Sequence, residues 1–291
     1  MCDCLVALYP ATASGNTLFA KNSDRPPSEA QVVERFPPRR EATTRTTHIE
    51  IDGRSRDTIA FVGSRPTWMW GVEHGVNVAG VAAGNATIYT TLDPRGAPDG
   101  LTGMDLVRLA LERASTAPGA VDVIGALLRR HGQGGTGHDG VDRPYWSSFL
   151  VADPLHAFVI ETSGSVFAVE PVERTRATSN RTTIPAFDAE HRHPRQPVEH
   201  LVDGRLAASR SVLADEPVTM DGLMSHLRSH VGGEDGYTIC MHVPDLEATT
   251  ASMIAELPID GPPNAWFLTG SPCTNEYTRL DPSSTPGRGY G

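Results

Sequence analysis

The sequence predicts an α+β sandwich in which runs of β-strands surround a block of helices. Short apolar, β-branched segments bounded by Gly, Pro, Asn and Asp fill the first third of the chain and return at residue 147. Between residues 101 and 131, hydrophobic residues recur at helical spacing instead. The 291 residues, 39% of them hydrophobic and 21% charged, suffice for one large core. This order of elements is typical of α+β domains.

We expect one domain over residues 1–280, since no internal repeat divides it, and a disordered Pro/Ser/Gly-rich tail over 281–291. The formal net charge is -10, from 25 Lys+Arg against 35 Asp+Glu, so a nucleic-acid partner is not expected. No apolar run approaches the about 20 residues that span a bilayer. No leader-like segment precedes Cys2, so we expect a cytoplasmic protein without a membrane partner.

The first predicted pair of strands is a hairpin. Cys4–Tyr9 and Thr17–Ala20 are apolar and β-prone, and turn-forming residues separate them. With a midpoint near Ala13, residues whose numbers sum to about 26 face each other. This register places Cys2 opposite Asp24, with Lys21 nearby, so that a polar cluster forms at the start of the chain.

Further strands follow the hairpin. We expect one at 31–36, a second hairpin around Asp52–Gly53, a Gly-rich strand at 76–83 and a short strand at 88–91. The second hairpin would pair residues 47–51 with 58–62. Trp68 and Trp70 lie between these strands. Large aromatic side chains usually pack in a core, and lining a substrate pocket is the alternative for this pair.

Two helices come next, at 101–115 and 117–131, joined at a turn in which Pro118 is well placed to start the second helix. The Gly-rich stretch 132–137 lacks the Gly-Lys-Ser/Thr of a phosphate loop. The rest of the chain predicts strands, then helices with Thr219 as an N-cap, then strands again. The strands are at 147–152, 157–162, 166–172, 237–242, 252–256 and 265–268, and the helices are at 197–214 and 219–231.

Cys2 directly follows the initiator methionine, and its small side chain predicts removal of Met1. Cys2 would then carry both a thiol and a free α-amine, whose pKa of about 7.7–8.0 suits a base near neutral pH. A nucleophile and a base on one residue is the arrangement of N-terminal threonine enzymes. The sequence therefore indicates nucleophilic catalysis by Cys2.

Several segments resemble the secernins and the related C69-type dipeptidases, which are relatives of bile salt hydrolase and penicillin V acylase. The resemblance runs in the family order over roughly residues 2–275 and implies the four-layer αββα fold of N-terminal nucleophile hydrolases. One of its runs of eight residues is Phe-Ala-Lys-Asn-Ser-Asp-Arg-Pro. The segments are Cys2–Leu8, Phe19–Pro26, Ser64–Gly71, Gly103–Arg108, Gly132–Gly135 and Thr249–Met253.

The same resemblance implies roles for individual residues. Asn85 matches an asparagine that stabilises an oxyanion, and Asn180 matches a second asparagine of the site. Asp24 matches the aspartate that holds the α-amine. Lys21 stands where the wider relatives carry an arginine, so a bidentate anion clamp is not expected there. The segment around Arg205 is weakly similar to the one that carries an active-site arginine in the wider relatives, so Arg205 is a candidate for substrate binding.

Other interpretations of these residues remain open. Without the resemblance, the two asparagines would be turn residues, Asp24 a cap and Arg205 a solvated helix charge. Cys4 could be the nucleophile if three residues were removed. A dipeptide would also need counter-charges for its termini, for which the candidates are Glu73, Arg65 and Arg205.

No metal or other cofactor is expected. The four cysteines, Cys2, Cys4, Cys240 and Cys273, show no metal-ligand spacing, and a cytoplasmic setting would keep them reduced. The eleven histidines include no HExxH pattern, and His191 and His193 lie in an Arg/Pro-rich segment that we interpret as surface.

Three functions are compatible with the sequence. The first is a cysteine dipeptidase or aminopeptidase that uses Cys2. The second is an amidase or acyltransferase acting on N-acyl compounds, which an apolar pocket around Trp68 and Trp70 would favour. The third is a non-catalytic interaction protein, which retention of Met1 would favour. The expected partner is a small peptide or an N-acyl amide, and a homo-oligomer is left open.

Overall fold

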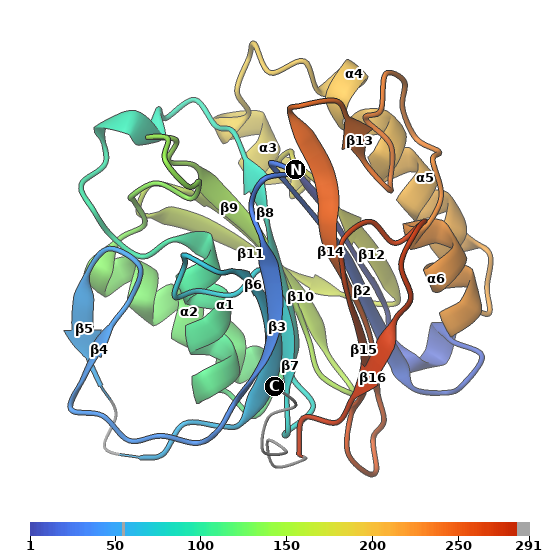
Figure 1. Cartoon of the computed structure of the whole chain (residues 1–291), viewed down its shortest axis with the longest axis horizontal. Helices are drawn as coiled ribbons and strands as arrows, with labels where there is room; N and C mark the ends of the chain where they lie inside the picture. Colours follow the sequence, from blue (N-terminus) through green and yellow to red (C-terminus); the bar gives the residue numbers. More distant parts are fainter. Residues whose placement is uncertain (54–55, 284–291) are drawn as a thin grey trace.

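The computed structural model describes residues 1–53 and 56–283, which form four layers in the order helices, sheet, sheet, helices (Figure 1). On one side, α1 (Gly103–Arg113) and α2 (Ala117–His131) cover the outer face of a seven-stranded sheet. On the other side, α5 (Asp203–Ala214) and α6 (Met220–Leu227) cover a second seven-stranded sheet. The predicted αββα sandwich is confirmed.

The sheet that carries the N-terminus has the strand order β12-β1-β2-β14-β15-β16, with β13 paired to β14, and its pairings are antiparallel. The first two strands of the chain therefore lie inside this sheet, between later segments. Its strands are β1 (Cys2–Ala7), β2 (Thr17–Arg25), β12 (Thr175–Thr178), β13 (His242–Val243), β14 (Glu247–Leu257), β15 (Asn264–Thr269) and β16 (Thr278–Leu280).

The second sheet has the order β11-β10-β9-β8-β7-β6-β3 and is also antiparallel. Its strands are β3 (Gln31–Phe36), β6 (Phe61–Pro66), β7 (His74–Asn77), β8 (Ala82–Ile88), β9 (Trp146–Ala152), β10 (Ala157–Ser163) and β11 (Val166–Val172). A separate hairpin joins β4 (Thr43–Arg45) to β5 (Glu50–Asp52). Two short helices, α3 (Pro185–His191) and α4 (Val198–Leu201), complete the fold.

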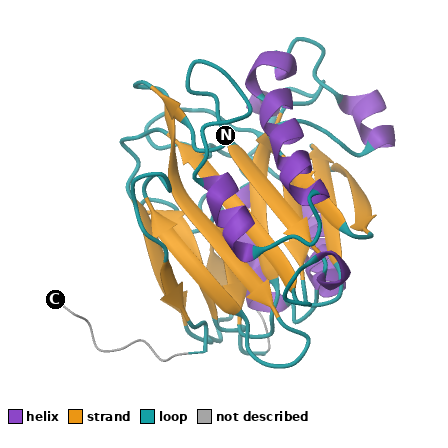
Figure 2. Ribbon diagram, turned by 90° about the vertical axis from the view of Figure 1, so that its right-hand side faces the viewer, coloured by secondary structure: helices purple, strands orange, loops and turns teal. Residues whose placement is uncertain are grey.

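Three apolar clusters fill the three spaces between the layers, and β1 contributes to two of them. Cys4 and Val6 face the opposite sheet, whereas Leu5 and Ala7 face α5 and α6. Figure 2 shows the helices of the second side lying across the strands of their sheet. The alternation continues to the chain start, so the Cys2 side chain is directed between the sheets.

The predicted register of the first hairpin is wrong by one residue. Cys2 pairs with Ser23, not with Asp24, and Asp3 pairs with Asn22. The loop contains a 3₁₀ turn, Tyr9–Ala11, which shifts the midpoint from the symmetric position. Because side chains alternate along a strand, this shift of one residue places the Cys2 and Asp24 side chains on opposite faces of the sheet.

Of the predictions for the other elements, some are confirmed and some are wrong. Helix α2 has the predicted bounds, and Thr219 caps α6 as expected, accepting a hydrogen bond from the Gly222 amide. The predicted hairpin around Asp52–Gly53 is wrong, because the 50–52 strand pairs with 43–45 and the 61–66 strand pairs with β3 and β7. Most of the predicted disordered tail, residues 284–291, lies outside the described residues.

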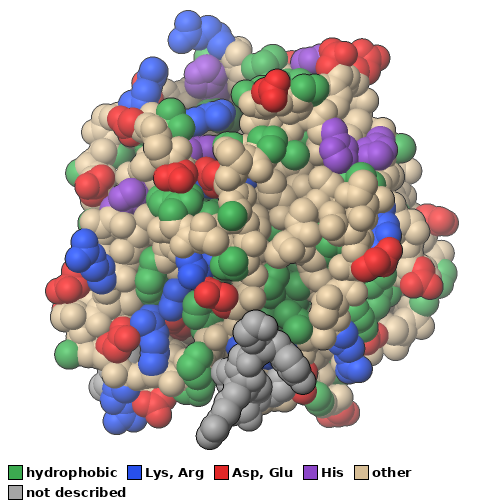
Figure 3. Space-filling view, viewed as in Figure 1, with side chains coloured by type: hydrophobic (Ala, Val, Ile, Leu, Met, Phe, Trp, Pro, Cys, Tyr) green, Lys and Arg blue, Asp and Glu red, His purple; other side chains and the backbone are tan. Residues whose placement is uncertain are grey.

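The surface drawn in Figure 3 mixes acidic and basic side chains without a broad field of one sign. Within residues 1–53 and 56–283, none of the helices combines the length and the apolar character needed to cross a bilayer.

Candidate active site

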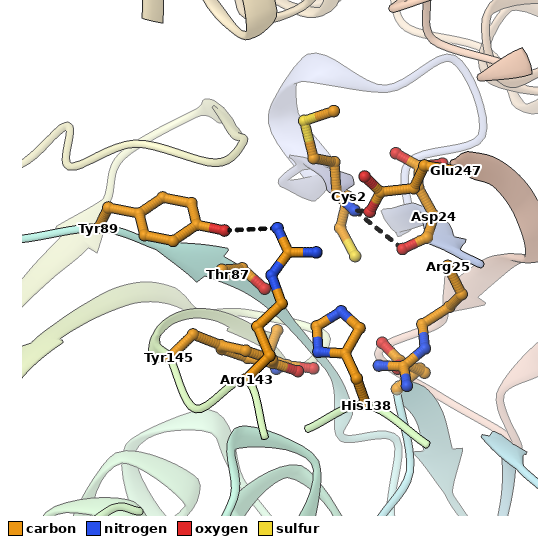
Figure 4. Close-up of a pocket in the computed structure, with 12 residues that line it drawn as sticks. Cys2, Asp24, Arg25, Thr87, Tyr89, His138, Arg143, Tyr145 and Glu247 are labelled. Atoms are coloured by element: carbon orange, nitrogen blue, oxygen red, sulfur yellow. Dashed lines mark hydrogen bonds and ion pairs between the residues drawn. The ribbon is translucent and has the colours of Figure 1, made fainter. Parts of the chain in front are cut away.

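A pocket lies at the start of β1, where residues from strands of both sheets meet the connection between α2 and β9 (Figure 4). Three residues that the sequence predicted for the site, Cys2, Asp24 and Asn85, line this pocket. The complete lining is Met1, Cys2, Asp24, Arg25, Glu73, Asn85, Thr87, Tyr89, His138, Arg143, Tyr145 and Glu247.

The thiol of Cys2 is almost fully buried, with a residue exposure of 4%. Burial raises the pKa of this thiol, and the ammonium group of Lys21 acts in the opposite direction but does not reverse the shift. The thiol is therefore protonated near neutral pH and needs a base to become a nucleophile. Its backbone N–H, which becomes the α-amine when Met1 is removed, donates to Asn180 Oδ1 at 2.9 Å.

Asn180 connects the chain start to the second sheet and to α5. Its Oδ1 also accepts a hydrogen bond from the Arg205 guanidinium at 2.9 Å, and its Nδ2 donates to the Thr87 carbonyl at 3.0 Å. With all these contacts made, the amide orientation is fixed. Asn180 does not line the pocket, so its contact with the Cys2 nitrogen indicates a positioning role.

Arg205 is fully buried and is not the solvated helix charge that its helix alone would suggest. It forms an ion pair with Asp3, and its Nη1 lies 3.7 Å from Asp24 Oδ2. Arg205 is not among the residues that line the pocket, although its Nη2 donates to Met1 Sδ at 3.6 Å.

Asp24 is 2% exposed, and its Oδ1 accepts a hydrogen bond from the Thr249 hydroxyl at 2.7 Å. Its Oδ2 is buried without a hydrogen-bond donor among the described residues. Burial raises the pKa of Asp24 to about 7, although the amino terminus and Arg205 both lower it. A carboxyl group with one oxygen that accepts no hydrogen bond from the described residues therefore lies beside the chain start, as the resemblance implies for the residue that holds the α-amine.

Lys21 is buried between the sheets and does not line the pocket. Its Nζ donates to Ser23 Oγ at 2.5 Å and lies 3.5 Å from Glu73 Oε2. Burial lowers the pKa of Lys21, but the Cys2 thiolate, when it forms, and the Glu73 carboxylate outweigh this effect and the pKa is raised. Lys21 is thus a fixed positive charge near the thiol. It also lowers the pKa of His74, whose burial has the larger effect in the same direction.

Asn85, on β8, has an amide that lacks strong partners. Its Nδ2 has Met104 Sδ as an acceptor at 3.4 Å, and thioether sulfur is a weak acceptor. Its Oδ1 has no partner within the described part of the chain. This amide lines the pocket together with Cys2 and can donate to a stronger acceptor, such as an oxyanion.

Besides Arg25, which is paired with Glu29 and Glu73, two charged residues of the pocket were not predicted from the sequence. Glu247, at the start of β14, is 12% exposed at its side chain and forms an ion pair with the α-ammonium of Met1. Arg143 has the hydroxyl of Tyr89 as a hydrogen-bond partner at 3.3 Å and forms no ion pair with any described carboxylate. In addition to the paired Arg25 and Glu73, the pocket therefore offers Glu247 as a negative and Arg143 as a positive group.

Met1 lines this pocket, and its backbone is held by residues on either side. Its α-ammonium contacts Glu247 and donates to the Asp24 carbonyl at 2.9 Å. The Met1 carbonyl accepts from the Asp24 N–H at 2.7 Å. Met1 is thus bound like the amino-terminal residue of a peptide, next to the Cys2 thiol.

The two tryptophans do not belong to the pocket lining. Trp70 packs against the helix-side cluster, with the Arg108 guanidinium 4.0 Å from its ring centroid. Trp68 packs with Met69, Met104 and Tyr145, of which only Tyr145 reaches the pocket. Both side chains therefore pack against core clusters, as is usual for large aromatic residues.

Arg65 and Glu73, the other candidates for counter-charges, are already paired. Arg65 forms an ion pair with Glu34 and donates to three backbone carbonyls. Glu73 pairs with Arg25 and Lys21. Cys4 is buried in the inter-sheet cluster, outside the pocket lining, and burial raises the pKa of its thiol. These surroundings favour Cys2 over Cys4 as the nucleophile.

No family model matches the chain. Solved structures with the same fold include a mutant conjugated bile acid hydrolase from Clostridium perfringens, with a TM-score of 0.61 and 13% identity over 97% of this chain and 92% of that chain. Penicillin V acylase from Agrobacterium tumefaciens has a TM-score of 0.57 and 13% identity over 96% and 86%. A Caenorhabditis elegans ortholog of N-acylethanolamine-hydrolyzing acid amidase has a TM-score of 0.52 and 15% identity over 87% and 91%.

The chain has the fold of N-terminal nucleophile hydrolases. These two matches cover nearly all of this chain and most of each similar structure, so the likeness concerns the whole αββα arrangement and not a single layer. The relation to secernins and C69-type dipeptidases stays a prediction from the sequence.

Proposed function

We propose that this protein is a cysteine amide hydrolase with Cys2 as the N-terminal nucleophile, and that its substrates are dipeptides or peptides with a free amino terminus. The proposal rests on the hydrogen bonds that the Met1 α-ammonium donates to the Glu247 carboxylate and to the Asp24 carbonyl. When Met1 is removed, these groups face the pocket beside the thiol. A substrate's amino-terminal residue can then occupy the space that Met1 leaves.

The first step requires a base, because the Cys2 thiol is protonated. The α-amine of Cys2, in its neutral form, takes the thiol proton, directly or through a water molecule, as the sulfur attacks the amide carbonyl. Asn180 Oδ1 accepts a hydrogen bond from this nitrogen and fixes its direction. Asp24 Oδ2, which has no donor of its own, accepts a further hydrogen bond from the amine.

The attack forms a sulfur–carbon bond and moves the carbonyl electron pair onto oxygen. Asn85 Nδ2 donates to this oxyanion in exchange for its weak sulfur acceptor. A single donor of this kind is worth about 2.7–4 kcal/mol in known enzymes. The amine returns the proton to the leaving nitrogen, the carbon–nitrogen bond breaks, and water hydrolyses the thioester by the reverse proton path.

The charges of the pocket suit a dipeptide. Glu247 binds the substrate ammonium, and Arg143, which has no carboxylate partner of its own among the described residues, binds the carboxylate. Both residues line the same pocket as Cys2. Lys21 supports the thiolate through its fixed charge and does not touch the substrate.

A second candidate function is hydrolysis of N-acyl amides. A groove beside the pocket shares Met1, Tyr89, Arg143 and Glu247 with it, and its outer part is apolar. An acyl chain could lie there, and the similar structures are named for bile acid, N-acylethanolamine and penicillin V substrates. Glu247, which also lines this groove, argues against N-acyl substrates, because an acyl group has no cation to pair with its carboxylate. The apolar residues of the groove are Pro197, Leu201, Val202 and Leu246.

The test compares free dipeptides with the same dipeptides acetylated at the amino terminus and with N-acyl amino acids. Purified protein with a verified amino-terminal Cys2 is assayed on each set, with Cys2→Ala as the background control. Faster hydrolysis of the free dipeptides supports the proposal. Preference for acylated substrates would favour the amidase alternative, and no Cys2-dependent hydrolysis in any set would favour the non-catalytic alternative.

A further inference from the structure

A second cluster of reactive side chains lies outside the pocket lining. The ligand atoms of His230, Cys240, His242 and Cys273 all lie within 4.8 Å of one another. His242 Nε2 is 3.4 Å from Cys240 Sγ and 3.3 Å from Cys273 Sγ. The ring centroids of His230 and His242 are 5.1 Å apart. No part of the mechanism above uses these four residues.

The backbone holds His230 beside Cys240. The Cys240 amide donates to the Ser229 carbonyl at 2.9 Å, and the Ile239 amide donates to the Val231 carbonyl at 3.0 Å. These two bonds flank His230 and fix the two segments against each other. The approach of the two side chains therefore does not depend on a ligand.

The other two residues arrive from different elements. His242 is two residues after Cys240 and starts β13, so the two side chains can share one side of an extended segment. Cys273 lies in the turn after β15, and Ser271 of that turn donates to the Thr249 carbonyl at 3.0 Å. Three separate segments thus converge on one point.

The distances fit a tetrahedral metal site. Zn–S bonds of about 2.3 Å and Zn–N bonds of about 2.0–2.1 Å put a sulfur and a nitrogen about 3.6 Å apart across a tetrahedron. The two sulfur–nitrogen distances here, 3.3 and 3.4 Å, are close to that value. Two thiolates also neutralise a divalent cation, and two imidazoles complete the softer ligand set that suits zinc.

We propose that His230, Cys240, His242 and Cys273 bind one Zn²⁺ ion in a closed, structural site. All four positions come from the protein, which is the pattern of structural zinc and not of catalytic zinc. His230 and His242 are exposed, so the ion can enter from solvent, while the buried Cys240 anchors it to the fold. This proposal replaces the expectation, drawn from sequence spacing, that no metal binds.

The proposed ion would stabilise a segment whose hydrogen bonds lead to Asp24. Met241, between two of the ligands, donates from its amide to the Thr249 hydroxyl at 2.8 Å and accepts from the Thr249 amide at 3.0 Å. The same hydroxyl donates to Asp24. Zinc would thus hold the segment that positions Asp24, without contacting the substrate.

The test uses the full chain, purified, reduced and stripped of metal, and titrated with Zn²⁺ against a chromophoric chelator. We expect one tight equivalent per chain, a rise in Tm with added Zn²⁺, and, with Co²⁺, the absorption of a four-coordinate thiolate site. His230→Ala and Cys273→Ser, at an exposed and a half-exposed position, should lose the tight equivalent and the Tm rise. His156→Ala, at a histidine whose side chain is 55% exposed, is the matched control and should keep both.

Three results would overturn the proposal. The wild type could bind no zinc, which would leave the cluster as sulfur–nitrogen hydrogen bonds only. The two variants could bind zinc as tightly as the control, which would place the ion elsewhere. The protein before reduction could show an intact mass lower by two hydrogens with Cys240 joined to Cys273, and fail to bind zinc after reduction, which would make the pair a disulfide.

Discussion

Glu247 gives the sharpest test of substrate class, because it binds an ammonium group only if the substrate has one. Glu247→Gln keeps the size and one acceptor oxygen but removes the charge. The Glu247 side chain is only 12% exposed, so its ion pair belongs with hydrogen bonds to charged groups and not with surface salt bridges. Such hydrogen bonds are worth about 1.5–3 kcal/mol.

That energy corresponds to a loss of about 10- to 150-fold in kcat/KM, at 1.36 kcal/mol for each factor of ten. The assay measures kcat/KM of wild type and Glu247→Gln on a free dipeptide and on its N-acetylated form. The loss should fall on the free dipeptide, while the acetylated form, which has no ammonium, should change little. Glu276→Gln, at a side chain 89% exposed, is the control and should match the wild type on both.

An equal loss on both substrates would refute the role of Glu247 in binding the ammonium, since a general disturbance of the pocket would then explain the effect. No loss on either substrate would refute it as well.

Four further predictions concern the remaining parts of the site. Cys2→Ala should abolish hydrolysis, while Cys4→Ser should retain most of it; the reverse pattern in a kcat measurement would move the nucleophile to Cys4. Asp24→Asn should lower kcat at least about tenfold in a folded protein, because the amine loses a charge-assisted acceptor; normal kcat would remove Asp24 from the mechanism. Since burial raises the pKa of Asp24 from 3.8 to about 7, the folded state binds its proton more tightly than the unfolded chain, and ionisation costs stability as pH rises through that window. The Tm of Asp24→Asn relative to wild type should therefore increase from pH 4 to pH 7, and a constant difference would contradict the shift. Arg143→Gln should raise KM for a free dipeptide but not for the dipeptide amide, and an equal rise for both would exclude a carboxylate contact.

The sequence was sufficient for the α+β class and for several elements because local periodicity and hydrophobic patterning repeat over many residues, whereas the four layers were implied by the family resemblance. Helix α2 has its predicted bounds for this reason, with a proline at its start and a glycine just after its end. The eight-residue run ending at Pro26 was specific enough to indicate the N-terminal nucleophile fold. The position of Cys2 after Met1 and the wider resemblance also pointed to Cys2, Asp24 and Asn85, which line one pocket.

The predictions that failed depend on how residues far apart in the sequence come together. The register of the first hairpin depends on a 3₁₀ turn that a symmetric loop model cannot place, and one residue of shift moves Asp24 to the other face. Glu247 gave no signal, because an acidic residue at the start of a strand is common and its partner lies 246 positions away. The proposed zinc site was missed for the same reason, because only two of its four residues, Cys240 and His242, are close in sequence.

The central claim is that Cys2 acts as the nucleophile once it is the first residue. The most direct measurement is the intact mass and amino-terminal peptide mass of active protein, before and after reaction with a thiol-reactive amide probe. The account predicts a chain that lacks Met1 and gains a single probe adduct on Cys2, in parallel with loss of activity. Active protein that retains Met1, or an adduct on Cys4 that accompanies inactivation, would contradict it.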